Sequence, residues 1–370
     1  MAGQRGKHPD VVVIGAGVFG LWVAREALHA GLSVVVTDRT GPGAGASGGV
    51  VGALTPHMPV RWRPMKELQL RALLSLEAET AALTAETGLE TGYCRAGRLS
   101  PLINARARAR AEEQALAARE VWRGEAAFRV LDTPPEAYAP VLPPESCAQG
   151  CVSDTLSARI DPRRYLQALG AAVERGAEIR RGWTAREVSP QGHVRFDRGE
   201  IQAGNVVIAA GWESFPLAPV AQGQGVKGQA AVLGADLPED MPVIQAPDLY
   251  VVRQGRGRVA VGSTSEKIWD HGAPDQGLDA VIDRARRFCP GLSTAPVLER
   301  WAGIRPKAPG REPMAGPVPG TRIVMATGGY KIGLGIAHEV GKALAAGIAG
   351  QPHPALPPEF APQPQRESPP

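Results

Sequence analysis

An apolar run near the N-terminus, ended by a glycine-rich turn, constrains the fold of this chain more than any other feature. Residues 10–17 read DVVVIGAG, residues 18–31 read VFGLWVAREALHAG and residues 32–38 read LSVVVTD. The first and third segments have the apolar composition of buried strands, whereas the middle segment has helical spacing and ends at a glycine. This order predicts a βαβ unit in a parallel sheet.

The turn of this unit reads GAGVFG over residues 15–20. Gly15 allows a tight turn, Gly17 lets the backbone approach a pyrophosphate, and Gly20 lets the helix pack close to the strand. A pyrophosphate at the helix N-terminus would meet unpaired amides and the positive end of the helix dipole. The alternative is a glycine turn that serves only helix packing.

Asp38, the last residue of the second strand, narrows the choice of nucleotide. A carboxylate there suits hydrogen bonds to a ribose and disfavours a 2′-phosphate, so NADP is less suitable than NAD or FAD. This motif alone does not separate FAD from NAD. A flavin needs coverage beyond one βαβ unit, and the glycine-rich segments at 47–52 and 328–335 are candidates for it.

Apolar strands that end in a glycine turn, as in a nucleotide-binding domain, occur at three places along the 370 residues: in 10–38, in NVVIAAG at 205–211, and in RIVMATGG at 322–329. One cofactor domain built from separated segments explains this interleaving better than two consecutive domains, so we predict an α/β (α+β) fold. The predicted boundaries are 1–90, 150–215 and 300–350 for a Rossmann-like FAD-binding domain, 91–149 and 216–299 for an inserted β-rich substrate domain, and 351–370 for a loose proline-rich tail.

The charge balance gives little support for a nucleic-acid partner. The chain has 41 basic and 37 acidic side chains, so its formal net charge is only +4. The densest basic run, RARAR at 106–110, alternates with alanine and winds around a helix instead of forming one stripe. We therefore expect a small-molecule partner, and a homo-oligomer is compatible with the sequence.

The cysteines Cys94, Cys147, Cys151 and Cys289 form no C-x-x-C pair and have no accompanying histidine spacing. A metal site and disulfides are therefore not expected, which fits a reducing compartment. The sequence has no signal-peptide pattern and no apolar run of membrane-spanning length, so we expect a cytoplasmic protein.

Six motifs together resemble the FAD-dependent D-amino acid oxidase family, in its glycine oxidase and sarcosine oxidase branch. They are VVVIGAGVFG with Asp38 and Arg39, GASGGVVGA, NVVIAAG, DLYVVRQGRGRVAVGSTSE, WAGIRPKAPGREPMAGP and TGGYKIGLGIA. The resemblance covers residues 10 to about 350 and is closest to glycine oxidases. It implies FAD held without a covalent link, because KAPGREPM lacks the cysteine by which sarcosine oxidases attach their flavin.

The glycine motif and the resemblance together give a set of expected cofactor contacts. These residues are Gly15, Gly17, Val18, Phe19, Gly20, Asp38, Arg39, Ala46, Ser47, Val51, Gly52, Val188, Gly211, Gly329, Tyr330, Lys331, Ile332, Gly333 and Leu334. For Val188 the resemblance implies a backbone contact to adenine.

Three residues are candidates for the catalytic site. The resemblance implies that Arg305 holds the substrate carboxylate, since a guanidinium matches a carboxylate bidentately. It also implies that Tyr250 lines the substrate pocket, and it places Lys331 where glycine oxidases have arginine and sarcosine oxidases a carboxylate-binding lysine. The alternatives are a surface ion pair for Arg305, a half-buried strand residue for Tyr250 and a solvent-directed side chain for Lys331.

Two neighbouring side chains are expected to serve the structure rather than the chemistry. Trp301 is expected to pack under Arg305 and fix its direction. His57 lies near the predicted flavin loop and is expected to be a loop histidine with satisfied hydrogen bonds.

The expected reaction is oxidation of the C–N bond of a small amino acid (glycine, a D-amino acid or an N-substituted glycine) to the imine. A hydride passes to flavin N5, and oxygen is the expected acceptor. Ser265 stands where glycine oxidases tend to be apolar, which leaves the size and polarity of the pocket open. Two alternatives are an oxidase acting on the carboxymethyl-amine of a modified tRNA base, because GASGGVVGALTPHMP also resembles such enzymes, and an FAD-bearing subunit of a multi-chain amine dehydrogenase.

Overall fold

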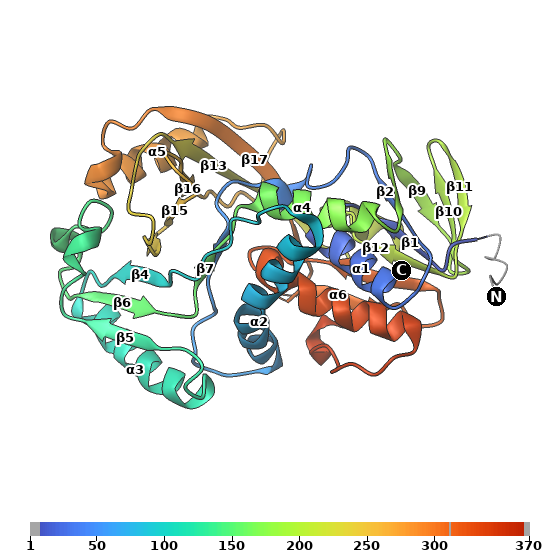
Figure 1. Cartoon of the computed structure of the whole chain (residues 1–370), viewed down its shortest axis with the longest axis horizontal. Helices are drawn as coiled ribbons and strands as arrows, with labels where there is room; N and C mark the ends of the chain where they lie inside the picture. The colour runs from blue at the N-terminus through green and yellow to red at the C-terminus, as the bar shows by residue number, and fades with distance from the viewer. Residues whose placement is uncertain (1–7, 311, 366–370) are drawn as a thin grey trace, which may run out of the picture.

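The computed structural model describes residues 8–310 and 312–365, which form two lobes (Figure 1). One lobe contains a six-stranded sheet and the other an eight-stranded sheet, with a three-stranded and a two-stranded sheet in addition. The α/β fold with two kinds of sheet is the one that the sequence predicts. Within the described residues, no helix is both long and apolar enough to cross a membrane.

The six-stranded sheet draws its strands from the beginning, the middle and the end of the chain. In spatial order they are β18 (Met314–Pro317), β19 (Ile323–Thr327), β12 (Asn205–Ile208), β1 (Val11–Ile14), β2 (Val34–Asp38) and β8 (Glu178–Arg181). All neighbours are parallel except β18 and β19. The cofactor lobe is thus assembled from segments far apart in sequence.

Four helices lie against this sheet or between the lobes: α1 (Val18–His29), α2 (Pro64–Thr87), α4 (Pro162–Glu174) and α6 (Gly333–Ala349). The largest buried apolar cluster joins them to strands β1 and β2 and includes Trp22 and Tyr165. Helices α1 and α6 approach so closely that a Cβ atom on Gly341 would lie 2.8 Å from Trp22 Cβ. Both helices begin at the glycine-rich turns that the sequence singles out, so their packing brings these two turns together.

The eight-stranded sheet forms the core of the other lobe. Its spatial order is β17 (Val297–Lys307), β13 (Gln224–Leu233), β16 (Val259–Gly262), β15 (Leu249–Arg253), β14 (Val243–Ala246), β4 (Arg98–Pro101), β6 (Cys151–Asp154) and β5 (Phe128–Leu131). Helix α5 (Gly277–Phe288) covers β13, β15 and β16, and helix α3 (Ala105–Val121) packs on β5. The two long strands β17 and β13 pair antiparallel along their whole length.

The remaining strands form two small sheets. One contains β9 (Ala185–Val188), β10 (His193–Phe196) and β11 (Gly199–Gln202), and the other pairs β3 (Ala53–Leu54) with β7 (Ala158–Arg159). Sheet membership differs from the predicted domain boundaries at two places. Strand β6 and residues 300–307 of β17 lie in segments assigned to the FAD-binding domain, yet both strands pair in the eight-stranded sheet.

Residues 351–356 have no regular structure and are mostly exposed, as expected of a loose tail, but residues 357–364 are fixed against the rest of the protein. Phe360 is fully buried in the core of the cofactor lobe, and Glu359 accepts a hydrogen bond from the backbone of Met65. Ala221 donates its amide to the carbonyl of Gln363. Phe360 ends a short 3₁₀ helix, Pro358–Phe360, and its buried ring anchors this proline-rich segment. Residues 366–370 lie outside the described part.

Candidate functional site

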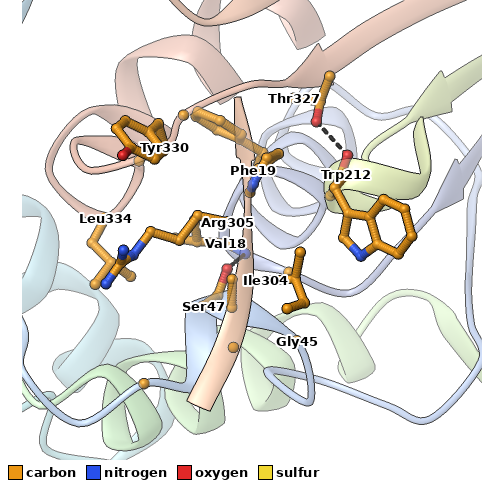
Figure 2. A pocket seen from close by; sticks show the side chains of 18 of the residues that line it. Val18, Phe19, Gly45, Ser47, Trp212, Ile304, Arg305, Thr327, Tyr330 and Leu334 are labelled. Carbon is orange, nitrogen blue, oxygen red and sulfur yellow. Dashed lines mark hydrogen bonds between the residues drawn. The ribbon is translucent and has the colours of Figure 1, made fainter. Parts of the chain in front are cut away.

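A cavity of about 980 Å³ lies between the two sheets. Its walls come from the turn after β1, residues 37–41 after β2, the loop 44–58, the far end of β17 and residues 326–334. Figure 2 shows Arg305 and Tyr330 on one side of this cavity and Trp212 on the other, with Val18 and Ser47 between them. The site is therefore formed where the carboxyl ends of parallel strands meet the substrate lobe.

The glycines of the turn after β1 are required by close backbone contacts. Gly15 has φ +107°, and a Cβ atom there would lie 2.3 Å from the carbonyl oxygen of Ala209. A Cβ atom on Gly20 would lie 1.9 Å from the carbonyl oxygen of Gly15. Gly17 precedes α1 without a side-chain cap, and the first turn carries no acidic residue. This arrangement leaves the helix N-terminus open to an anionic group such as a pyrophosphate.

Ser47 and Asp38 complete this end of the cavity. The Val18 amide donates to Ser47 Oγ at 3.1 Å. Asp38 accepts from the amide of Ala16 at 2.8 Å and, with its other oxygen, from the amides of Thr40 and Gly41, each at 2.7 Å. Asp38 therefore ties the end of β2 to the turn after β1, and its oxygens keep further lone pairs for a ribose.

Residues 328–334 run beside the end of β17. Lys307 and Gly329 form an antiparallel bridge, and the Tyr330 amide donates to the carbonyl of Pro306 at 3.1 Å. A Cβ atom on Gly329 would lie 2.7 Å from Phe19 Cε2, so only glycine fits against that ring. The Tyr330 hydroxyl lies 2.7 Å from Ser265 Oγ, within hydrogen-bond distance. This contact links the late glycine-rich segment to the substrate lobe.

Arg305 is held at the cavity by neutral oxygens. Its Nη1 donates to the carbonyl of Thr264 at 3.0 Å and its Nη2 to Ser263 Oγ at 2.9 Å. Within the described part of the chain it forms no ion pair with a carboxylate, so the alternative of a surface ion pair is wrong. Burial lowers the pKa of Arg305 from its ordinary value, but an arginine keeps its charge in a protein.

The other two catalytic candidates lie at different depths. Tyr250 is a half-buried residue of β15 that lines the cavity. Lys331 lines it as well but is exposed, with Nζ 5.6 Å from the centre of the Tyr330 ring. At that distance the ammonium makes a cation–π contact. Lys331 is therefore a residue of the rim.

The cavity brings together every predicted site residue except Gly20 and Val188. Gly20 packs behind the turn, in the role that its place in the motif predicts. Val188 pairs with Val194 inside the three-stranded sheet, and the wall of the cavity is formed by residues 183–186 of the same segment. Val188 thus lies two residues beyond the part of β9 that lines the cavity, and its expected backbone contact to adenine stays a prediction.

The sequence predicts structural roles for two further residues near the site, His57 and Trp301. His57 Nδ1 lies 2.7 Å from Gln69 Oε1, which also accepts the His57 amide, so this histidine has local partners as expected. Trp301 lies four residues before Arg305 on the same strand, about 13 Å. Its indole lies over Gly303, where a Cβ atom would be 2.5 Å from Trp301 Cη2, and Gly303 pairs with Gly228, over which the Arg305 guanidinium lies. The expected packing of Trp301 under Arg305 stays a prediction.

Sequence reasoning missed several residues that shape the cavity. They include Gly228, Ser263 and Thr264 around Arg305, and Arg98, Gln245 and Trp212 elsewhere on the wall. Ser263 and Thr264 lie inside the motif DLYVVRQGRGRVAVGSTSE, from which only Tyr250 was expected at the site, and the others lie in no local motif whose spacing carries chemistry. Only the pairing of distant strands brings them to the site.

Both the fold and the glycine cradle define a dinucleotide-binding flavoprotein, in which a pyrophosphate would meet the N-terminus of α1 and a flavin would extend toward residues 329–334. The family model described as "FAD dependent oxidoreductase" matches residues 10–346. The chain therefore belongs to this family of D-amino acid oxidase relatives, and the prediction of FAD as cofactor is confirmed.

Similar proteins support the glycine oxidase branch. A glycine oxidase of Pseudomonas aeruginosa is 29% identical over 368 residues, which cover 95% of this chain and 98% of that protein. The bifunctional protein ThiO/ThiG of Synechocystis sp. is 30% identical over 343 residues, 88% of this chain but 49% of that protein. The chain thus spans about half the length of the bifunctional relatives it matches. The crystal structure of glycine oxidase from Geobacillus kaustophilus has the same fold, with a TM-score of 0.87 at 20% identity over 96% of this chain and 98% of that one.

Proposed function

We propose that this protein oxidises the C–N bond of a small amino acid, namely glycine, a D-amino acid or an N-substituted glycine, to the imine. Arg305 binds the substrate carboxylate, and oxygen takes up the electrons. When bound, FAD supplies the acceptor for the hydride. The similarity to the glycine oxidase of Pseudomonas aeruginosa along nearly the whole of both chains supports this reaction class.

One observation carries the proposal: the guanidinium of Arg305 faces the cavity with neutral partners only. Ser263 Oγ and the carbonyl of Thr264 fix its orientation without neutralising its charge. A half-buried cation whose hydrogen-bond partners are all neutral favours an anionic ligand, and a carboxylate offers two oxygens to the guanidinium. A carboxylate held there fixes the position of the α-carbon, and such positioning contributes much of the rate in reactions of this kind.

Few of the described residues that line the cavity could act as a base for the proton of the substrate amine. Among these lining residues, the only acidic ones are Asp38 and Glu213, and the only imidazole is that of His57. Asp38 binds backbone amides, Glu213 pairs with Arg39, and His57 lies against Gln69. None of these groups is free to act as a base beside Arg305. We infer that the substrate binds with its amine already neutral.

The test is anaerobic mixing of the purified flavoprotein with glycine, sarcosine and D-alanine, following the loss of flavin absorbance. We expect reduction by at least one of them and recovery of the absorbance on admitting oxygen. Arg305→Ala should raise the KM by about 10- to 100-fold with flavin still bound, because hydrogen bonds to charged groups contribute about 1.5–3 kcal/mol. The matched control is Arg300→Ala, which removes an arginine of the same strand that pairs with Asp279 at the surface.

The outcomes separate the alternatives. An unchanged KM in Arg305→Ala places the carboxylate anchor elsewhere. No reduction by any small amino acid removes this substrate class and favours a second candidate, the carboxymethyl-amine of a modified tRNA base. That candidate is supported by 29% identity to the bifunctional protein MnmC of Marinobacter nauticus, which is named for the biosynthesis of 5-methylaminomethyl-2-thiouridine in tRNA. Activity that appears only with a partner chain would instead indicate a subunit of a larger dehydrogenase. The cytoplasmic location and a homo-oligomer remain predictions from the sequence.

A further inference from the structure

The register of the eight-stranded sheet places one row of residues across the face that meets the cavity. Trp301 pairs with Ala230, Ala230 with Gly262, Gly262 with Tyr250, and Tyr250 with Gln245. Residues at paired positions point to the same face of a sheet. The row therefore crosses the sheet from β17, which carries Arg305, to β14. Its members on β13 and β16 are the small residues Ala230 and Gly262, and those on β15 and β14 are the polar residues Tyr250 and Gln245.

Arg98 of β4 pairs with Val243, two residues before Gln245 on β14, and so lies on the same face of the sheet as Gln245. Its Nη1 donates to Gln245 Oε1 at 2.7 Å, and both residues line the cavity. Arg98 also faces Asp154 across the strand pair and forms an ion pair with it, with 2.7 Å between Nε and Oδ2. Asp154 in turn accepts the Ser157 amide at 2.7 Å. The Asp154 carboxylate thus neutralises the charge of Arg98 at Nε, and Arg98 Nη2 is used by neither Asp154 nor Gln245.

The far end of the cavity has hydrogen-bond donors without partners. Among the described residues, Arg98 Nη2, the amide nitrogen of Gln245 and the Tyr250 hydroxyl form no side-chain hydrogen bond. Arg98 is only 2% exposed, but none of these three atoms is among the fully buried side-chain atoms that lack a partner, so all three are accessible from the cavity that their residues line. A buried ion pair such as that of Arg98 and Asp154 is no better for stability than well-packed apolar residues. The arrangement therefore favours a ligand that brings oxygen acceptors to this end.

The Arg305 guanidinium and the group formed by Tyr250, Gln245 and Arg98 are separated by about the length of a substrate molecule. The Arg305 guanidinium lies over β13 and bonds to Ser263 just after β16, whereas Gln245 is on β14. Two to three strand spacings correspond to about 10–14 Å. A chain of about five carbons with an oxygen at each end, plus hydrogen bonds of about 3 Å, fills this distance.

We propose that Tyr250, Gln245 and Arg98 form a second substrate subsite that binds a distal carboxamide or carboxylate oxygen. The preferred substrates are then amino acids whose side chain or N-substituent ends in such a group, rather than glycine itself. This inference rests on the proposed function of Arg305 as the anchor of the first carboxylate.

The experiment measures binding of non-reacting acids to the flavoprotein by the change in flavin absorbance. The ligands are acetate, glutaramate, glutarate and 5-methylhexanoate, which has the shape of glutaramate without its polar end. We expect glutaramate or glutarate to bind at least tenfold more tightly than 5-methylhexanoate, a factor of ten being about 1.4 kcal/mol. Equal affinity for all three longer acids overturns the subsite.

Substitutions test whether Gln245 and Arg98 cause this preference for acids with a polar end. Gln245→Met keeps the length of the side chain but removes the donor, so the preference for glutaramate over 5-methylhexanoate should fall toward one. The paired variant Arg98→Leu with Asp154→Leu removes both charges together and should abolish the same preference without leaving one of them buried alone. A preference that survives both variants contradicts the proposal.

The two proposals fail in different ways. If acetate binds and Arg305→Ala weakens it, but the longer acids show no preference, only the second subsite is wrong. If no carboxylate changes the flavin spectrum, the anchor and the proposed function fail as well.

Discussion

The guanidinium of Arg305 lies directly against the backbone of Gly228: a Cβ atom on Gly228 would be 2.1 Å from Arg305 Cζ. In the strand register Arg305 pairs with Val226, so its side chain crosses β13 diagonally to reach this glycine. Gly228 thus provides the space in which Ser263 and Thr264 hold the guanidinium. The direction of the proposed carboxylate anchor depends on a residue that has no side chain.

Gly228→Ala should displace the guanidinium and raise the KM for an amino-acid substrate by about tenfold, because a small misplacement at a reacting centre is costly. The bound flavin should remain. Steady-state kinetics together with the flavin content check this expectation. Gly272→Ala is the matched control, since a Cβ atom there would meet only Ile304, at 4.0 Å. Equal kinetics for the two variants would show that Arg305 does not depend on Gly228.

The cofactor cradle gives a second prediction. In Gly20→Ala, the added methyl group would collide with the carbonyl of Gly15, so α1 must move away from the turn that receives the pyrophosphate. We expect a protein that folds but is purified without FAD. Gly347→Ala adds the same methyl group in open space on the exposed side of α6, away from the cavity, and should retain FAD. Absorbance of the purified proteins and titration with FAD measure the difference.

The lack of a base beside Arg305 predicts the dependence of the reaction on pH. Because the substrate must bind with a neutral amine, kcat/KM should rise with pH until it levels off at the pKa of the substrate amine. Between two substrates, the midpoint of this rise in kcat/KM should differ by as much as the pKa values of their amines differ. A midpoint that stays fixed for all substrates would instead report a group of the protein.

Lys331 should contribute less than Arg305, because it lies exposed at the rim. Exposed charge pairs contribute about 0.2–1 kcal/mol, so Lys331→Ala should raise the KM by no more than about fivefold. The effect should weaken further at high salt. Measurement of KM at low and high ionic strength tests this, and a loss as large as that of Arg305→Ala would place the ammonium on the substrate carboxylate.

Local patterns account for the parts of this site that were predictable. The turn over Gly15 and Gly20 is dictated by contacts within a few residues and by one neighbouring strand, so its spacing is visible in the sequence. The contact between Arg305 and Gly228 arises only from the pairing of β13 with β17, which no local pattern encodes. The same holds for Arg98 and Gln245. Phe360 was missed because its burial is a tertiary contact of a segment without periodicity.

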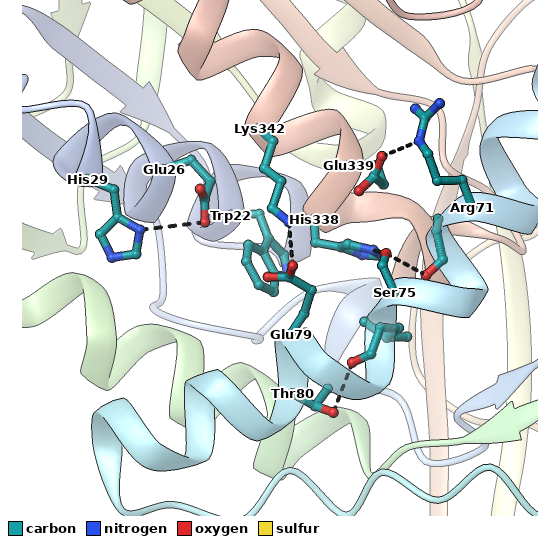
Figure 3. A network of polar contacts seen from close by, with 12 residues as sticks. Trp22, Glu26, His29, Arg71, Ser75, Glu79, Thr80, His338, Glu339 and Lys342 are labelled. Atoms are coloured by element: carbon teal, nitrogen blue, oxygen red, sulfur yellow. Dashed lines mark hydrogen bonds and ion pairs between the residues drawn. The ribbon is translucent and has the colours of Figure 1, made fainter. Parts of the chain in front are cut away.

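The last prediction concerns His338, which is fully buried between α2 and α6 (Figure 3). Its Nε2 lies 2.9 Å from Ser75 Oγ, its ring centre is 5.8 Å from that of Trp22, and its Nδ1 has no hydrogen-bond partner among the described residues. Burial lowers the pKa of His338 to about 4, although the nearby carboxylates Glu339 and Glu79 act in the opposite direction.

The sign of the effect on stability follows from the two pKa values. In the folded protein His338 stays neutral down to about pH 4, whereas an unfolded histidine takes up a proton near pH 6.5. The unfolded state therefore binds more protons between these values, and the contribution to stability is complete above pH 6.5 and lost as the pH falls to about 4. The loss is on the order of 3 kcal/mol.

Denaturant unfolding in excess FAD at pH 7 and at pH 5 measures the part of this loss that falls between these pH values, about 2 kcal/mol. His338→Gln should be less stable at pH 7 because a packed ring is replaced, but its stability should change less between the two pH values. His193→Gln, which alters an exposed histidine that pairs with Glu200, should retain the pH dependence of the natural protein. If the difference between pH 7 and pH 5 is the same in His338→Gln as in the natural protein, the destabilisation at low pH comes from other groups.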